Sequence, residues 1–152
     1  MAIATYSSKE VKIIVGVIPI IGFVDGSFVD VEYNEETFKP YTGADSEHAR
    51  SRNANESGKI TIKLNQTSPC NDLLSLIYNT DKETGNGIVP IAIKDGSGNT
   101  VVFGAECYIE KAPKISFGKD IEAREWVFYV AKLKIHVGGN NVYGQLYDGG
   151  NK

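Results

Sequence analysis

The stretch "GKITIKLNQTSPCNDLLSLIYN", residues 58–79, joins two kinds of secondary structure without a linker. In its first half, polar residues alternate with three apolar ones, Ile60, Ile62 and Leu64. A period of two is typical of a strand that is buried on one face and solvated on the other. The first half therefore predicts a half-buried strand.

The second half of the stretch carries the signals of a helix start. Ser68 can accept hydrogen bonds from free backbone N–H groups, and Pro69 suits the first helical turn. Three apolar residues then follow at helical spacing and are expected to form the packed face: Leu73, Leu76 and Ile77. We therefore predict one helix, over about residues 69–80, on the flank of a β-rich fold.

Strand signals recur along the rest of the chain, and no internal repeat or heptad pattern accompanies them. Turn sequences such as "DGSGN" lie between the segments that carry these signals: residues 11–15, 28–33, 88–95, 100–111 and 124–137. The chain is predicted to be mainly β. We expect an antiparallel β-sandwich or half-open barrel with one flanking helix, in a single domain over residues 1–140.

Two of these segments have faces that alternation assigns to the core. In the first, the expected buried face consists of Val101, Phe103, Ala105, Cys107 and Ile109. The second, 124–137, is expected to be one long strand that begins buried on both faces and ends buried on one. One face is apolar along its length: Val127, Tyr129, Ala131, Leu133, Ile135 and Val137. The other face carries three apolar residues, with Trp126 in the core, and then three basic ones: Trp126, Phe128, Val130, Lys132, Lys134 and His136.

Two other segments do not resemble core. Residues 34–57 are polar and long for a hairpin connection, and loops of this length are usually functional or disordered. Phe38 and Tyr41 stand among their polar residues. Residues 141–152 are rich in Gly and Asn and are predicted to form a flexible C-terminal tail.

Composition excludes several functional classes. A net charge of −3 argues against a nucleic-acid grip, which normally needs a basic patch. The longest apolar run, residues 13–24, is interrupted by Gly and Pro and is shorter than the about 20 residues of a membrane-spanning helix. Two cysteines, Cys70 and Cys107, do not make a disulfide framework, and we expect a reducing compartment.

Motifs for catalysis are also missing. The sequence has no nucleophile elbow and no phosphate-binding loop. His48 and His136 have no carboxylate or cysteine at ligand spacing, which argues against a metal site. We expect no catalytic, cofactor-binding or metal-binding residues, and the sequence does not resemble an enzyme.

Several strands lack the Pro and Lys that monomers place on unpaired edges. Closing the sheet across subunits removes the same liability. This favours assembly into a ring.

The order and spacing of five pieces resemble the tail-tube proteins of contractile-tailed bacteriophages, a family of phage structural proteins. The likeness covers residues 5–140. Its pieces are "GFVDGSFVDVEYNEETF" (22–38), "GADSEHAR" (43–50), "GKITIKLNQTSPCNDLLSLI" (58–77), "IVPIAIKDGSGNTVVFGAECYIEKAP" (88–113) and "FGKDIEAREW" (117–126).

The resemblance implies a structural virion protein. Six copies would close into a ring, and rings would stack into a hollow tube inside a contractile sheath, through which DNA passes. The implied partners are further copies of the chain, the tail sheath protein, the tape measure protein and the baseplate. The tube would be assembled in the host cytoplasm and would contact no membrane.

The resemblance also suggests roles for particular residues. The long loop would reach a neighbouring subunit or ring, mobile in the isolated subunit and ordered in the tube, through Phe38, Tyr41, His48, Arg50 and Arg52. Carboxylates on the polar faces of strands would line the lumen, where Lys59 and Lys63 share the candidate surface: Asp30, Glu32, Glu106 and Glu110.

Two alternatives remain open at this stage. The chain could be a ring protein of a phage-like contractile device, such as a tailocin or a type VI secretion system. It could also be a monomeric β-sandwich binding module, for example for carbohydrate, which would need a solvent-facing aromatic platform.

Overall fold

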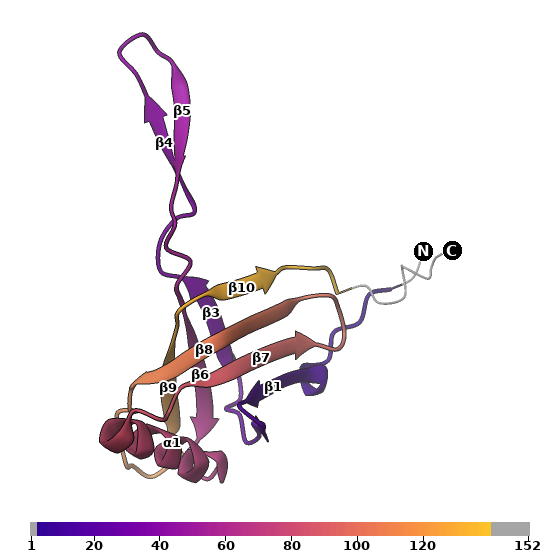
Figure 1. The fold of residues 1–152 in the computed structure, drawn as a ribbon. Coiled ribbons are helices and arrows are strands. Elements are labelled where there is room, and N and C mark those ends of the chain that lie inside the picture. The colour runs from indigo at the N-terminus through magenta and orange to yellow at the C-terminus, as the bar shows by residue number, and fades with distance from the viewer. Residues whose placement is uncertain (1–2, 141–152) are drawn as a thin grey trace.

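The computed structural model describes residues 3–140, so the predicted C-terminal tail, 141–152, lies outside the described residues. Eight strands form one antiparallel sheet in the order β2-β1-β7-β8-β9-β6-β3, with β10 also paired to β8 (Figure 1). The strands of this sheet are β1 (Val11–Val15), β2 (Ile18–Pro19), β3 (Val29–Tyr33), β6 (Gly58–Asn65), β7 (Val89–Asp95), β8 (Val101–Lys111), β9 (Ala123–Val130) and β10 (Leu133–His136). The chain is mainly β and its sheets are antiparallel, as predicted, and the main sheet does not close into a barrel.

Three elements lie outside this sheet. They are a short 3-10 helix, η1 (Ser8–Glu10), the single α-helix α1 (Cys70–Thr84), and a separate two-stranded sheet of β4 (Phe38–Thr42) and β5 (His48–Arg52). In Figure 1 the β4–β5 hairpin projects from one end of the sheet, and α1 lies at the opposite end.

The opening stretch forms the centre of the core, as the alternation predicted. In β6 every second residue is buried, and Ile60, Ile62 and Leu64 are fully inaccessible to solvent. β6 pairs with β9 along its whole length, from Gly58 opposite Val130 onward. The central pair of strands therefore has one dry face and one solvated face.

The helix is confirmed and is longer than predicted. The Ser68 hydroxyl accepts a hydrogen bond from the Cys70 amide (3.2 Å), and Pro69 directly precedes the helix. The helix continues to Thr84 and ends at Gly85, whose φ of 77° is the left-handed conformation of a C-cap. The prediction stopped at 80 because the last turn is polar and shows no apolar spacing.

The predicted packed face of α1 is right only at Ile77, which packs against the core. Leu73 and Leu76 are 40% and 64% exposed, whereas Cys70 and Leu74 are buried. The Cys70 thiol accepts a hydrogen bond from the amide of Ile21 (3.4 Å), which fixes this side of the helix against the chain after β2. Rotation about the helix axis is thus set by a contact between segments far apart in sequence.

The predicted face of β8 is also wrong in its first half. Val101 and Phe103 are 41% and 42% exposed, and Val102 faces the core instead. Against β7, Cys107 lies opposite Val89 but Gly104 lies opposite Ile91, so β8 has one more residue than β7 over this interval. Such a bulge inverts the alternation on one side of it. Cys107 and Ile109, beyond the bulge, are buried as predicted.

The segment 124–137 is two strands rather than one. β9 buries Trp126, Phe128 and Val130, and β10 begins with buried Leu133. Between them the chain breaks its alternation, and the Ala131 amide donates to the carbonyl of Glu106 (3.1 Å). The core-facing side therefore changes parity at the break, which corrects the single apolar face predicted for this segment.

The buried thiol of Cys107 gives a test of the core. Burial raises its pKa from 9.0 to about 11. Because this pKa is higher in the folded state, the contribution to stability is complete below pH 9 and is lost as the pH rises toward 11. Between pH 8 and pH 11, the free energy of unfolding should fall by about 2 kcal/mol less in Cys107→Ala than in the wild type. Urea denaturation at both pH values, under reducing conditions, measures this.

Ile62→Val is the matched control, since it also alters a fully buried side chain but carries no ionisable group. It should show the same alkaline loss as the wild type. An equally steep loss in Cys107→Ala would contradict the assignment.

Candidate assembly surfaces

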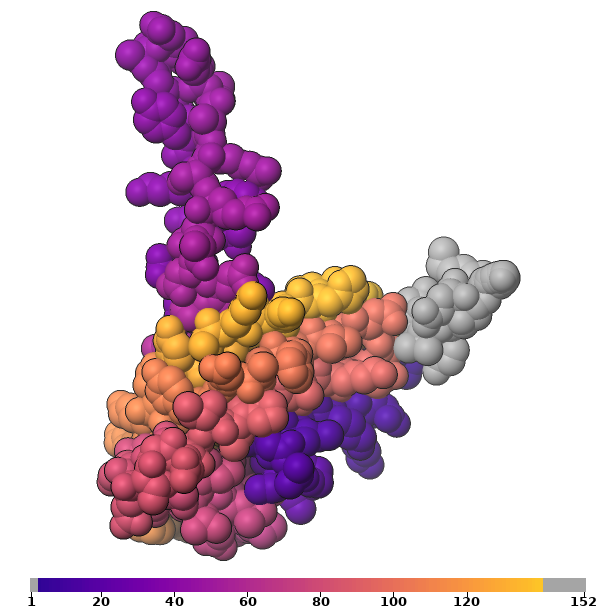
Figure 2. All heavy atoms as spheres, in the orientation of Figure 1, coloured from indigo at the N-terminus to yellow at the C-terminus, as the bar shows by residue number. Residues whose placement is uncertain are grey.

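The β4–β5 hairpin stands clear of the rest of the molecule (Figures 1 and 2). Its two strands pair only with each other, from Phe38 opposite Arg52 to Thr42 opposite His48. All of its strand residues are exposed except Phe38, which is half-buried. Residues 34–57, predicted to be a long polar loop, therefore contain a regular two-stranded β-hairpin.

The hairpin gathers the five predicted connector residues but divides them between two faces. Phe38, His48, Arg50 and Arg52 lie on one face, because directly opposed residues of an antiparallel pair share a side. The guanidinium of Arg50 lies 3.8 Å from the centre of the Phe38 ring and that of Arg52 lies 5.7 Å from it. Tyr41, 62% exposed, lies on the other face.

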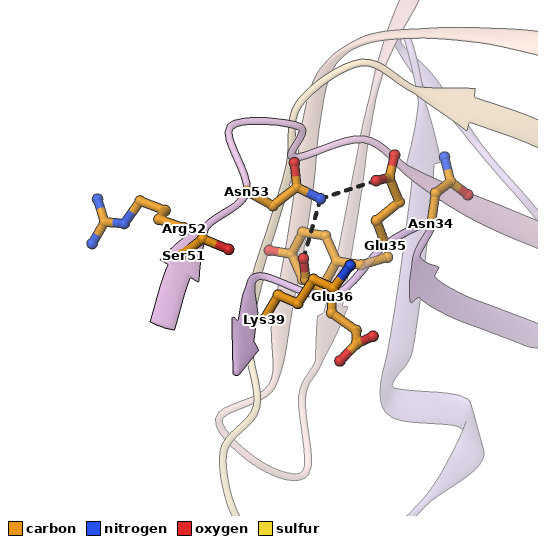
Figure 3. A pocket seen from close by; sticks show the side chains of 8 residues that line it. Asn34, Glu35, Glu36, Lys39, Ser51, Arg52 and Asn53 are labelled. Atoms are coloured by element: carbon orange, nitrogen blue, oxygen red, sulfur yellow. Dashed lines mark hydrogen bonds between the residues drawn. The ribbon is translucent and has the colours of Figure 1, made fainter. Parts of the chain in front are cut away.

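Amide and carboxylate groups hold the base of the hairpin (Figure 3). The Asn53 side chain donates to Glu35 Oε1 (3.0 Å) and to the carbonyl of Glu36 (3.2 Å), and Asn55 donates to the other oxygen of Glu35. Hydrogen bonds from Asn53 and then Asn55 lower the pKa of Glu35. These contacts join the two strands where they leave the body, and sequence reasoning missed them because the partners are 18 and 20 residues apart.

The same figure shows an open, polar pocket at this base. Its volume is about 800 Å³, and its lining includes Tyr33, Lys39 and Arg52. The hydrogen bonds from Asn53 and Asn55 to Glu35, which we call the clamp, occupy one side of the pocket (Figure 3). The pocket is thus a space beside a structural joint, with no nucleophile or base arranged for chemistry among its lining residues.

The four predicted lumen carboxylates are all exposed on strands of the main sheet. Asp30 and Glu32 belong to β3, and Glu106 and Glu110 belong to β8. Between these strands in the sheet lie β6 and β9.

Lysines of β6 pair with two of these carboxylates. Lys59 Nζ lies 3.2 Å from Glu110, and Lys63 Nζ lies 3.0 Å from Asp30. The hydrogen bond to Asp30 raises the pKa of Lys63. Lys59 and Lys63 were the two residues that argued against an acidic surface, and the positive charge of each is neutralised by a neighbouring carboxylate. Because these groups are at the surface, each pair adds little to stability.

The four strands β3-β6-β9-β8 also have two open edges among the described residues. β3 pairs with β6 on one side only. On the other side of the group, β7 accompanies β8 only as far as Cys107, which leaves residues 108–111 without a strand partner on that edge. Both edges offer backbone groups to another chain.

No arrangement for metal or membrane binding is seen in residues 3–140. No group of three or more His, Cys, Asp or Glu side chains is placed to hold an ion there, and His48 and His136 lie on different sheets. None of the described helices is long and apolar enough to cross a membrane. Trp126 is 3% exposed, so it cannot serve as the aromatic platform of a binding module.

Comparison with known sequences gives two matches over most of the chain. The family model described as "Bacteriophage PhiTE tail tube protein" matches residues 3–138. The "Structural protein ORF10" of Pseudomonas phage KPP10 is 34% identical over 145 residues, which cover 90% of this chain and 84% of that protein.

Solved structures with a similar fold come from contractile and phage-like particles. The anti-feeding prophage cap (AFP tube terminating cap) has a TM-score of 0.64 at 10% identity, covering 90% of this chain and 93% of that one. A chain of the PVC sheath–tube complex, an extracellular contractile injection system in its extended state, gives 0.60 at 15% identity, with 87% and 91% covered. A chain of the native gene transfer agent virion gives 0.61 at 13% identity, with 88% and 100% covered.

Proposed function

Because the chain belongs to the bacteriophage PhiTE tail tube protein family, and is thus a structural virion protein, we propose that six copies close into a ring and that rings stack into the hollow tube through which phage DNA passes. The observation that carries this is the group β3-β6-β9-β8, which has a solvated face carrying carboxylates and lysines and an open edge on each side. Joining β3 of one copy to residues 108–111 of the next would continue the sheet around a lumen. The family is a structural one, which favours a non-enzymatic role.

We place the carboxylate face toward the lumen. Ion pairs neutralise Lys59 and Lys63, while Glu32 and Glu106 are in no salt bridge among the described residues. The surface is then neutral to acidic. DNA, whose affinity for proteins depends on neutralising phosphates with cations, would pass without adhering.

We assign the hairpin to contacts between rings. It projects from the body, carries an aromatic ring under two guanidinium groups, and contributes nothing to the core of its own subunit. Exposed aromatic and Arg side chains are the residue types that dominate interface energies. On this proposal residues 1–140 are one tail-tube domain, and sheath, tape measure and baseplate contact the assembled tube, which forms in the host cytoplasm.

A related tube in a contractile injection device is the second candidate. The fold likeness to the PVC chain favours it. Sheath, tape measure and baseplate genes beside the coding sequence, together with capsid genes, would favour the phage tube over this candidate.

The oligomeric state tests the proposal directly. Concentrated purified protein should show six-membered rings and stacked tubes in negative-stain micrographs, and light scattering should report masses far above one subunit. A sample that stays monomeric at high concentration would overturn it. A map of the tube that places Asp30, Glu32, Glu106 and Glu110 on its outer surface would overturn the lumen assignment alone.

A further inference from the structure

A groove lies between α1 and the segment that follows β8. The helix lies at the end of the molecule opposite the hairpin (Figure 1). The volume of the groove is about 290 Å³. Aromatic, apolar and amide side chains line it together with one arginine, and among them are Asn71, Tyr78, Asn79, Ile115, Arg124 and Trp126. The Trp126 indole N–H already donates to the Asn71 side chain (2.9 Å), which leaves the floor of the groove ordered.

The arginine in this groove is buried without a counter-charge. Arg124 is 9% exposed, and its Nη1 donates only to the carbonyl of Ala123 (3.2 Å), with the Phe117 ring 5.3 Å away. Within residues 3–140 no carboxylate lies at ion-pair distance from it. A guanidinium has five N–H donors, and burying one without a partner is costly. The groove is therefore suited to an anionic ligand.

The tip of the hairpin supplies anionic groups that have no partner of their own. Asp45 and Glu47 flank Ser46 in the turn between β4 and β5, and all three are exposed. Their side chains make no hydrogen bond or ion pair among the described residues. The turn is narrow, since Ser46 has a φ of 64° and its amide donates to the carbonyl of Gly43 (3.0 Å).

We propose that the Arg124 groove is the socket for the acidic hairpin tip of a second copy in the neighbouring ring. The tip and the groove lie at opposite ends of the subunit, which is the arrangement that a head-to-tail stack requires (Figure 1). Their charges are complementary, and neither has a partner among residues 3–140 of its own chain. The inference rests on the proposed role of the hairpin between rings and names the surface that receives it.

Cysteine cross-linking tests the contact in full-length protein. In tubes of Ser46→Cys/Asn79→Cys, mild oxidation should link subunits into ladders of covalent multimers, because Asn79 lines the groove. The matched control is Ser46→Cys/Leu76→Cys. Leu76 is on the same helix and 64% exposed but does not line the groove, so this pair should not link. Cys70 and Cys107 are buried and should form no cross-link.

A double-mutant cycle tests the charges. Asp45→Asn/Glu47→Gln, which removes the charges without adding new ones, should raise the concentration needed for tube formation about tenfold or more, and Arg124→Gln should do the same. Combining them should add little, because both remove one interaction. Circular dichroism and melting curves establish whether Arg124→Gln folds; if it does not, the cross-link, which leaves Arg124 in place, decides the question.

The outcomes separate the two proposals. Additive charge effects, or tubes that cross-link no better at Asn79 than at Leu76, would overturn the socket. If removal of the hairpin still abolishes stacking in that case, the hairpin connects rings through another surface. If tubes stack normally without the hairpin, the connector role itself is wrong.

Discussion

Removal of the β4–β5 hairpin is expected to leave a folded subunit that forms rings but no longer stacks. The cut is best made by replacing residues 38–52 with two glycines, because Thr37 and Asn53 are already joined by a backbone hydrogen bond of 2.8 Å. This keeps the clamp of Asn53 and Asn55 on Glu35, which a wider deletion of residues 40–55 would remove. The melting temperature should change by only a few degrees, since the hairpin strands pair only with each other.

Electron microscopy and sedimentation of the deletion variant measure the effect. Tubes should be absent at concentrations about a hundredfold above those at which the wild type stacks, because one whole interface of several anchor residues is lost. Ala49→Ser, a small change on a hairpin strand, is the control and should stack normally. Tubes of ordinary length from the deletion variant would refute the connector role.

The strands could be predicted from the sequence because their alternation is local. Successive side chains of a strand point to opposite faces, so the local pattern alone places three apolar residues on the inner face, where the fold buries them: Ile60, Ile62 and Leu64. Where alternation failed, the cause was pairing with a distant strand. The bulge beside Cys107 follows from its register with β7, and the break before Leu133 follows from a hydrogen bond to Glu106. Neither register leaves a mark in the local composition.

The rotation of α1 was unpredictable for a similar reason. The face through Leu73 and Leu76 satisfies helical spacing as well as the face through Cys70, Leu74 and Ile77, which packs against the core. Contacts of Cys70 with the chain after β2 choose between the two faces. Spacing identifies a helix and its amphipathicity, but which face is packed depends on the segment of the chain that contacts the helix in the fold.

The candidate surfaces divide in the same way. Glu110 could be placed on the polar face of a strand from alternation, and Arg50 in the polar segment between two strands from composition. The clamp at Glu35 could not, because its partners are far away in sequence. Arg124 had a usable signal that was overlooked: it shares parity with Trp126 and Phe128, so alternation places a charge on the buried side of β9. A charged residue in phase with the core is a sign of a site worth locating.

The pairing of β3 with β6 determines which residues of β3 direct their backbone groups to the open edge. The Lys63 amide donates to the carbonyl of Phe28, and the Asn34 amide donates to that of Ser57. Hydrogen-bonded positions alternate along an antiparallel pair, so even-numbered residues of β3 bond to β6. Val31, between them, directs its N–H and C=O to the open edge, where the neighbouring subunit of the ring would bind.

Val31→Pro should therefore weaken ring formation while leaving the subunit folded. Proline removes the outward donor and places its ring in the path of the neighbour, yet it keeps the ladder to β6 and is tolerated on edge strands. Losing one hydrogen bond at each junction costs about 1 kcal/mol, and the steric clash adds to this, so ring formation should need at least about tenfold more protein. Val31→Thr, similar in shape with its N–H intact, should still form rings in size-exclusion chromatography with light scattering. Rings from the proline variant at wild-type concentrations would mean that subunits join through another edge, and the continuous wall of strands would have to be abandoned.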